Sequence, residues 1–320
     1  MGWVALRDFE VARTSMTIYG WLVFPLAWIT HWLVLHAADR VLSSAASTYR
    51  GPPGSAGALR VVHTASVLAL TAQAAWEASE WVGRWTPAHT AWAACATAVP
   101  AIVCLWFVTQ WRASSRWPFT RDGDAYAIAA GGPIAVMLAV WFFAANMLSP
   151  GDASPLPFVP LINPLELTLA LVLVVVFRWA RRFARLSERA LYGWFGAALF
   201  VALNGVVLRA AHHFGDIEWR LIALLGSKPL QAALTLSWTV TALAVMFVAT
   251  NRHLRPLWMV GAGLLAVVVG KLFLVDLPAL SGLPRVVAFL GVGVLLLLIG
   301  YLSPLPPANE KVGRASDSVP

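Results

Sequence analysis

The feature that most constrains this chain is a series of long apolar runs separated by short polar segments. A helix that crosses the hydrocarbon core of a bilayer needs about 20 largely apolar residues. Runs of roughly that length lie at 18–38, 61–82, 88–109, 125–148, 164–180, 190–211, 231–250, 257–277 and 283–303. The sequence therefore predicts an all-α fold, a polytopic transmembrane helical bundle with about nine spanning helices.

Two of these runs are weaker than the rest. Glu77 and Glu80 interrupt the run at 61–82, and the run at 164–180 is short. Hydrophobic residues nevertheless make up 59% of the 320 residues and charged residues only 12%, which is far from the composition of an ordinary soluble domain. Membrane is therefore the expected environment of the whole chain.

The distribution of Lys and Arg predicts how the helices are oriented. Alternate connections of the nine-helix layout hold 15 basic residues on one side and 7 on the other. Because short cytoplasmic loops carry an excess of Lys and Arg, the richer side is expected in the cytoplasm. We expect a multi-pass protein of the inner-membrane type with its C-terminus cytoplasmic. An N-terminus on the outside without a cleavable signal suggests that the chain corresponds to the tail of a longer protein.

The formal net charge of +8 does not indicate a nucleic-acid-binding protein, because the basic residues fall in short segments between apolar runs. Cys95 and Cys104 stand nine residues apart in one run, on roughly opposite sides of a helix, and cannot pair within it. The sequence has no zinc, redox, haem or phosphate-loop motif. We therefore expect no metal and no cofactor, and membrane lipids as partners.

The end of the run at 190–211 carries the first candidate site, formed by Asn204, Arg209, His212 and His213. Helical spacing places both imidazoles beside the guanidinium, since they follow it by three and four residues. One interpretation is an interfacial cation cluster that faces lipid headgroups. The other is a binding site for an anion or a headgroup, because Arg offers a bidentate fork and His titrates near neutrality.

A second group of charges lies near the C-terminal end, where Lys271 and Asp276 share one predicted helix. They stand five residues apart, about 140° around the axis, so they are poor mutual partners. Lys271 is expected either to extend toward the outer interface or to face other helices. Arg285, at the start of the next run, is the expected counter-ion of Asp276 in an intramembrane ion pair.

Three further features lie on the same predicted outer side. Glu77 and Glu80 form a stripe with Arg84, interpreted either as a Glu80–Arg84 surface pair or as paired carboxylates that carry protons. In the loop at 158–166, Asn163 is expected to cap the following helix, with Pro164 at its first position. The stretch 216–227 is expected to form a short amphipathic helix on the outer surface, a lid over the polar groups.

Several motifs together resemble a known family. They are NGVVLR at 204–209, His212-His213, Gln231, Ser237-Trp238, RPLW at 255–258, KLFLVDL at 271–277 and GYLSPLPP at 300–307, with PLINPL at 160–165. The segment 204–307 resembles the bacterial membrane-protein family called domain of unknown function 2339. Members are commonly longer, with additional helices upstream, so the resemblance implies that the chain corresponds to their C-terminal portion. It implies no particular activity.

This resemblance suggests three regions. Residues 1–150 form an N-terminal four-helix membrane region that is weakly family-like, 151–307 form a C-terminal family-like region with about five helices, and 308–320 form a disordered cytoplasmic tail.

Three functions fit the sequence. The first is a transporter-like or envelope protein that binds an anionic small molecule or lipid headgroup in an outward-facing polar cavity. The second is a membrane-embedded enzyme that acts on a lipid-linked substrate at the outer face, with Glu77, Asp276 or His213 as acid or base. The third is a structural scaffold subunit. No nucleophile elbow or metal-ligand run favours the enzyme, and no inverted repeat favours a secondary transporter.

Overall fold

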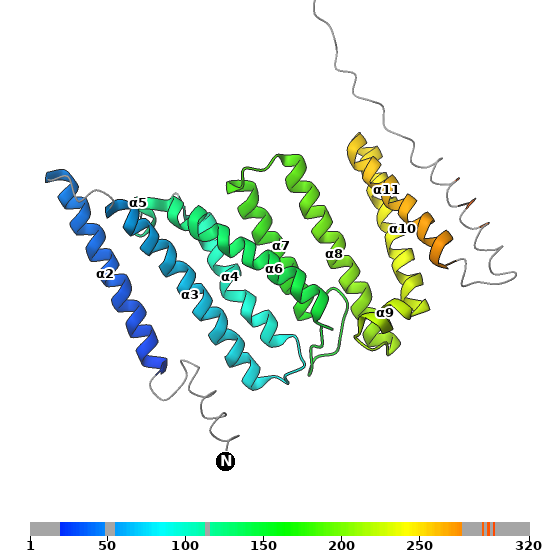
Figure 1. Cartoon of the computed structure of the whole chain (residues 1–320), viewed down its shortest axis with the longest axis horizontal. Coiled ribbons are helices and arrows are strands. Elements are labelled where there is room, and N and C mark those ends of the chain that lie inside the picture. The colour runs from blue at the N-terminus through cyan, green and yellow to red at the C-terminus, as the bar shows by residue number, and fades with distance from the viewer. Residues whose placement is uncertain are drawn as a thin grey trace, which may run out of the picture. The chain divides into compact units, whose positions relative to one another are not determined.

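The computed structural model describes residues 20–48, 55–112 and 116–276, together with positions 290, 293, 294 and 297. Every regular element in this part of the chain is helical (Figure 1). The helices are α2 (Gly20–Thr48), α3 (Ser55–Trp85), α4 (Trp92–Trp111), α5 (Phe119–Asp124), α6 (Gly131–Leu148), α7 (Pro164–Phe183), α8 (Glu188–Gly215), α9 (Leu221–Gly226), α10 (Lys228–Asn251) and α11 (Arg255–Lys271), with π-helical segments η1 (Ala125–Ala130) and η2 (Leu272–Asp276). The predicted all-α class is confirmed.

Within the described residues, six helical stretches are long and apolar enough to cross a membrane: Leu22–Val41, Trp92–Trp111, Ala125–Leu148, Glu188–Gly215, Lys228–Asn251 and Arg255–Leu274. The two weaker runs of the sequence lie in α3 and α7, which have spanning length but each contain several charged residues. The run at 283–303 lies outside the continuously described residues. The predicted number of about nine spanning helices therefore stays a prediction.

The chain divides into two compact units, one ending at Arg209 and the other beginning at Ala210. In the first unit, α3, α4, α6 and α7 pack around a core of buried apolar side chains that includes Leu105, Leu138 and Val172. Buried alanines such as Ala101 and Ala130 lie in the same core, and small residues let membrane helices approach closely. The expected division at residue 150 is not tested by this packing.

In the described part of the second unit, α10 and α11 form the main packed pair. Met246 and Ala242 of α10 pack against Leu265 of α11, and Gly261 of α11 lies close to Met246 and Ala242. A Cβ atom at Gly261 would lie 2.6 Å from Cγ of Met246, so only glycine fits there. In the stretch at 216–227, helix is observed only at α9, shorter than the amphipathic helix expected from the sequence.

The π-helix η1 precedes α6 and is held by α7. The indole nitrogen of Trp179 donates a hydrogen bond to the carbonyl oxygen of Ala127, at 2.7 Å. Gly131 makes room for this indole, because a Cβ there would lie 2.7 Å from its nitrogen. Short π-helical segments are often found at functional sites. This one positions Tyr126 in the core.

Candidate functional site

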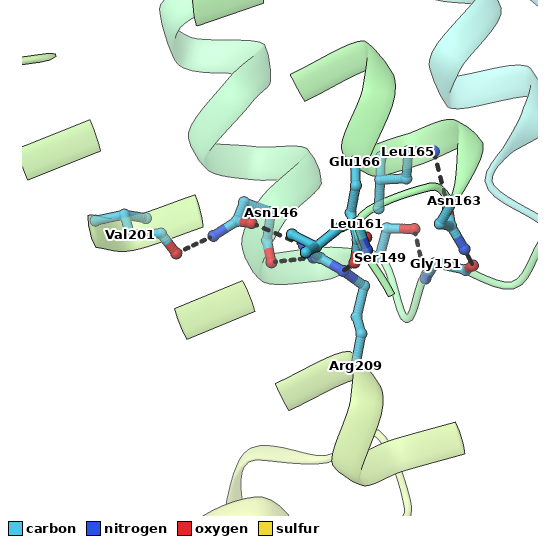
Figure 2. Close-up of polar contacts among 9 residues, drawn as sticks. All are labelled: Asn146, Ser149, Gly151, Leu161, Asn163, Leu165, Glu166, Val201 and Arg209. Carbon is cyan, nitrogen blue, oxygen red and sulfur yellow. Dashed lines mark hydrogen bonds and ion pairs between the residues drawn. The ribbon is translucent and has the colours of Figure 1, made fainter. Parts of the chain in front are cut away.

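Arg209 is the centre of a polar network in the first unit, where its side chain is completely buried (0% exposed). Its Nε donates to Oε1 of Glu166 at 3.2 Å, Nη2 donates to Oδ1 of Asn146 at 3.2 Å, and Nη1 donates to the carbonyl oxygen of Asn146 at 3.3 Å. Figure 2 shows these contacts converging from α6, α7 and α8. The guanidinium thus joins three helices that are separate in the sequence.

Glu166 supplies the balancing charge and is itself held in place. Its side chain is only 5% exposed, and its second carboxylate oxygen accepts a hydrogen bond from the backbone nitrogen of Leu161. It lies in the first turn of α7, where the helix dipole favours an acidic side chain. The loop before α7 and the dipole of α7 therefore both support the carboxylate that faces Arg209.

Asn163 fixes the start of α7, as predicted. Its side-chain oxygen accepts from the backbone nitrogen of Leu165 at 2.8 Å, and Pro164 occupies the first helical turn. Its amide nitrogen donates to the carbonyl oxygen of Gly151 at 2.6 Å. The capping residue therefore also ties the two ends of the loop at 149–163 together (Figure 2).

Asn146 connects the network to α8 a second time. Its Nδ2 donates to the carbonyl oxygen of Val201 at 3.0 Å, while its Oδ1 accepts from Arg209. The residue is 1% exposed. Because a buried amide needs partners for both its donor and its acceptor atoms, the two bonds fix its orientation.

Two glycines provide the space for the side chains of the network, because neither has a Cβ atom. Gly151 has φ +74°, a conformation that side-chain-bearing residues rarely adopt, and a Cβ there would lie 2.6 Å from Cδ of Arg209. Gly205 faces Asn146, and a Cβ there would overlap Oδ1 of Asn146 and lie 2.8 Å from Nη2 of Arg209. The network is therefore closely packed on both sides.

These contacts determine what Arg209 can do chemically. Its charge is balanced by a carboxylate and its nitrogens bond to protein oxygens, so it is not presented to solvent. An anionic ligand would reach the guanidinium only by replacing Glu166. In its observed state the arrangement joins helices.

The structure places the predicted site residues in different surroundings. Asn204, half-buried, donates its amide to the carbonyl oxygen of Phe200 on its own helix at 2.7 Å. His212 and His213 belong to the second unit, where their rings lie 4.9 Å apart. Nδ1 of His212 bonds to the carbonyl oxygen of Ile217 at 2.5 Å. The partners of Arg209 that the structure reveals, Glu166 and Asn146, were not among the predicted site residues.

The other predicted groups are only partly described. Lys271 points toward α10, where its Nζ donates to Oγ1 of Thr235 at 2.7 Å and to the carbonyl oxygen of Gln231 at 3.2 Å. The side chain of Asp276 and all of Arg285 lie outside the described residues, so their pairing stays a prediction. Glu77 is half-buried and Glu80 exposed, near the end of α3. Within the described ranges, no three His, Cys, Asp or Glu side chains are grouped to hold a metal ion.

The helical units and their apolar spans define the class of this chain as a multi-pass membrane protein. It belongs to the family described as predicted membrane protein (DUF2339), whose model matches residues 1–306. The match therefore includes the N-terminal half, which the sequence motifs had linked to the family only weakly. Comparisons with curated proteins and with solved structures found no match.

Proposed function

We propose that this chain is a structural scaffold of the bacterial cytoplasmic membrane, in which the Arg209 network fixes the arrangement of α6, α7 and α8. The observation that carries the proposal is the complete burial of Arg209 opposite Glu166. In a low-dielectric interior a charged pair with well-placed hydrogen bonds specifies one arrangement of helices, because displacing one helix leaves a charge without its partner. A scaffold requires such a fixed arrangement.

A second candidate function is binding of an anionic small molecule or lipid headgroup. The observation that favours it is that Glu166 reaches Arg209 from the turn directly after a loop, the 149–163 segment. If that loop moves, a ligand phosphate or carboxylate takes the place of Glu166 on the planar guanidinium. This hypothesis makes the protein transporter-like, with the loop end of the network facing outward.

Native mass spectrometry of the full chain tests the two functions against each other. For a scaffold, Arg209→Gln lowers stability, and the lipids and solutes that co-purify with the folded protein stay the same as in the wild type. For an anion-binding protein, Arg209→Gln loses a specific anionic adduct at equal folded yield. If Arg209→Gln does not fold, Arg209→Lys serves instead, because lysine keeps the charge but lacks the planar fork. An adduct lost in Arg209→Lys would overturn the scaffold.

The orientation of the helices is a separate part of the proposal. We expect Ser187, in the basic connection before α8, to face the cytoplasm and Ser227, before α10, to face outside. Single cysteines at these positions, in a chain without Cys95 and Cys104, should react oppositely with a membrane-impermeant thiol reagent added to intact cells. Labelling at position 187 from outside would reverse the proposed topology.

A further inference from the structure

A second buried polar cluster lies in the first unit, away from the Arg209 network. Nε2 of His63 on α3 lies 3.0 Å from Oδ2 of Asp39 on α2, and Nδ1 of His63 is hydrogen-bonded to the hydroxyl of Tyr126 in η1. The same carboxylate oxygen accepts a bond from the indole nitrogen of Trp117 at 2.9 Å. The carboxylate, the imidazole and the phenol are therefore linked by consecutive hydrogen bonds across three helical elements.

The direction of the hydrogen bonds follows from the chemistry of the groups. An ionised carboxylate only accepts, so Nε2 of a neutral His63 carries the proton and donates to Asp39. Nδ1 is then the acceptor and receives the hydroxyl proton of Tyr126. Each of these two hydrogen bonds holds one proton, which either of the two bonded groups is able to carry. The Arg209 network differs, because arginine keeps its proton in proteins.

Burial restricts what this cluster is able to bind. Asp39 is 5% exposed, His63 4% and Tyr126 2%. A substrate larger than a water molecule does not reach groups buried to this degree without opening the helices, whereas a proton is passed along existing hydrogen bonds. Titratable groups inside a membrane protein are expensive and typically mark ion or proton pathways.

The two polar clusters lie at opposite ends of one helical stretch. Tyr126 is near the start of Ala125–Leu148 and Asn146 is near its end, which separates them by roughly 30 Å at 1.5 Å per residue. This is about the thickness of the hydrocarbon core. When Ala125–Leu148 crosses a membrane, this length places the titratable cluster toward one surface and the Arg209 network toward the other.

Other charged or titratable side chains lie close to the cluster residues in the sequence of each element. They are His36 and Arg40 on α2, Arg60 on α3, and Asp124 directly before η1. His36 packs edge-on against Trp117, with ring centroids 4.6 Å apart. Asp124 is exposed, and a hydrogen bond from Arg112, together with the nearby charges of Arg112 and Arg60, holds its pKa below the ordinary value. Exposed charged side chains are thus present on the same elements as the cluster.

We propose that Asp39, His63 and Tyr126 form a proton relay, a function beyond the proposed scaffold. When hydronium gives a proton to Oη of Tyr126, Tyr126 passes its own proton to Nδ1 of His63, and His63 passes the Nε2 proton to Oδ2 of Asp39. Bonds form at Oη, Nδ1 and Oδ2, while the bonds broken are one in hydronium, the original O–H of Tyr126 and the N–H of His63. The relay gains one proton, stored on Asp39, and hydronium becomes water.

Infrared difference spectroscopy of the full chain in lipid tests the relay, with ¹³C-labelled tyrosine and aspartate as probes. When the pH is lowered from about 8 to about 5, the wild type should gain a carboxylic-acid band together with a shifted tyrosine band. Asp39→Asn should lose the carboxylic-acid band, and Tyr126→Phe the tyrosine shift. In His63→Gln both changes should be lost.

A second Asp–His pair supplies the matched control. His89 and Asp152 lie 3.2 Å apart, but the His89 side chain is 70% exposed. His89→Gln should leave the carboxylic-acid and tyrosine bands of the relay unchanged. If wild-type protein that remains folded shows neither band across this pH range, Asp39, His63 and Tyr126 are only a structural network. This outcome is measured on the wild type alone, so the test does not depend on whether a variant folds.

Discussion

Replacing Arg209 by glutamine is expected to lower the free energy of unfolding by about 3–5 kcal/mol, the usual loss when one partner of a buried ion pair is removed. The substitution leaves the Glu166 carboxylate buried without its counter-ion and removes the bonds from the guanidinium to Asn146. Thermal unfolding of the full chain in detergent, followed by circular dichroism, measures the loss.

Two further variants show whether the ion pair is the cause. Glu166→Gln should cost a similar amount, because it leaves Arg209 unbalanced. The double variant should lose less than the sum of the two single losses, since neither charge remains. The exposed pair Arg220–Glu218 is the matched control, and Arg220→Gln should change stability by at most about 1 kcal/mol. Equal losses at Arg209 and Arg220 would show that burial of the pair contributes nothing.

The sequence predicts the helical class because the physical requirement is local. A long apolar run is visible without knowing its neighbours, and the run expected at 125–148 coincides with the observed span Ala125–Leu148. The start of α7 was equally predictable, because an N-cap bond joins residues two apart in the chain. Charged residues within α3 and α7 made the number of spanning helices harder to predict, since local hydropathy cannot tell a charge facing a protein neighbour from one facing water.

The candidate site was only half predictable. Arg209 stands out as a charge at the end of an apolar run, but its partner Glu166 lies 43 residues away, and only helix packing brings the two together. The run at 125–148 did contain a signal for buried polar clusters. Its side chains with polar atoms are Tyr126, Trp141 and Asn146. Tyr126 and Asn146 each belong to one of the two buried clusters. Isolated polar residues in a spanning helix therefore indicate where other helices contribute partners.

The environment of Arg209 also changes what its neighbours in sequence imply. Helical spacing predicts His212 and His213 beside the guanidinium, which allows two interpretations, an interfacial cation cluster or an anion site. The structure instead satisfies Arg209 from α6 and α7, with oxygen atoms already in position. Spacing along one helix predicts which residues share a face, but not which face is covered by a carboxylate of another helix.

Substituting Gly205 by alanine is expected to lower the free energy of unfolding by about 1–3 kcal/mol, the usual cost of overpacking a filled core. The added methyl group would overlap Oδ1 of Asn146 and lie 2.8 Å from Nη2 of Arg209. Relief requires α8 to move away from α6, which would stretch the bonds of Asn146 to Arg209 and Val201. Chemical denaturation in mixed micelles measures the cost.

The same helix supplies a matched control for this prediction. Gly196 also lies in α8, but a Cβ there would have no neighbouring atom within 4 Å. Gly196→Ala should therefore be neutral or stabilising by about 0.5–1 kcal/mol, because alanine loses less backbone entropy in a helix. In an Asn146→Ala background, Gly205→Ala should cost less than in the wild type, since the main overlapping atom is gone. Equal effects at positions 196 and 205 would show that α8 does not approach α6 closely at Gly205, and the packing argument for the Arg209 network would fail with it.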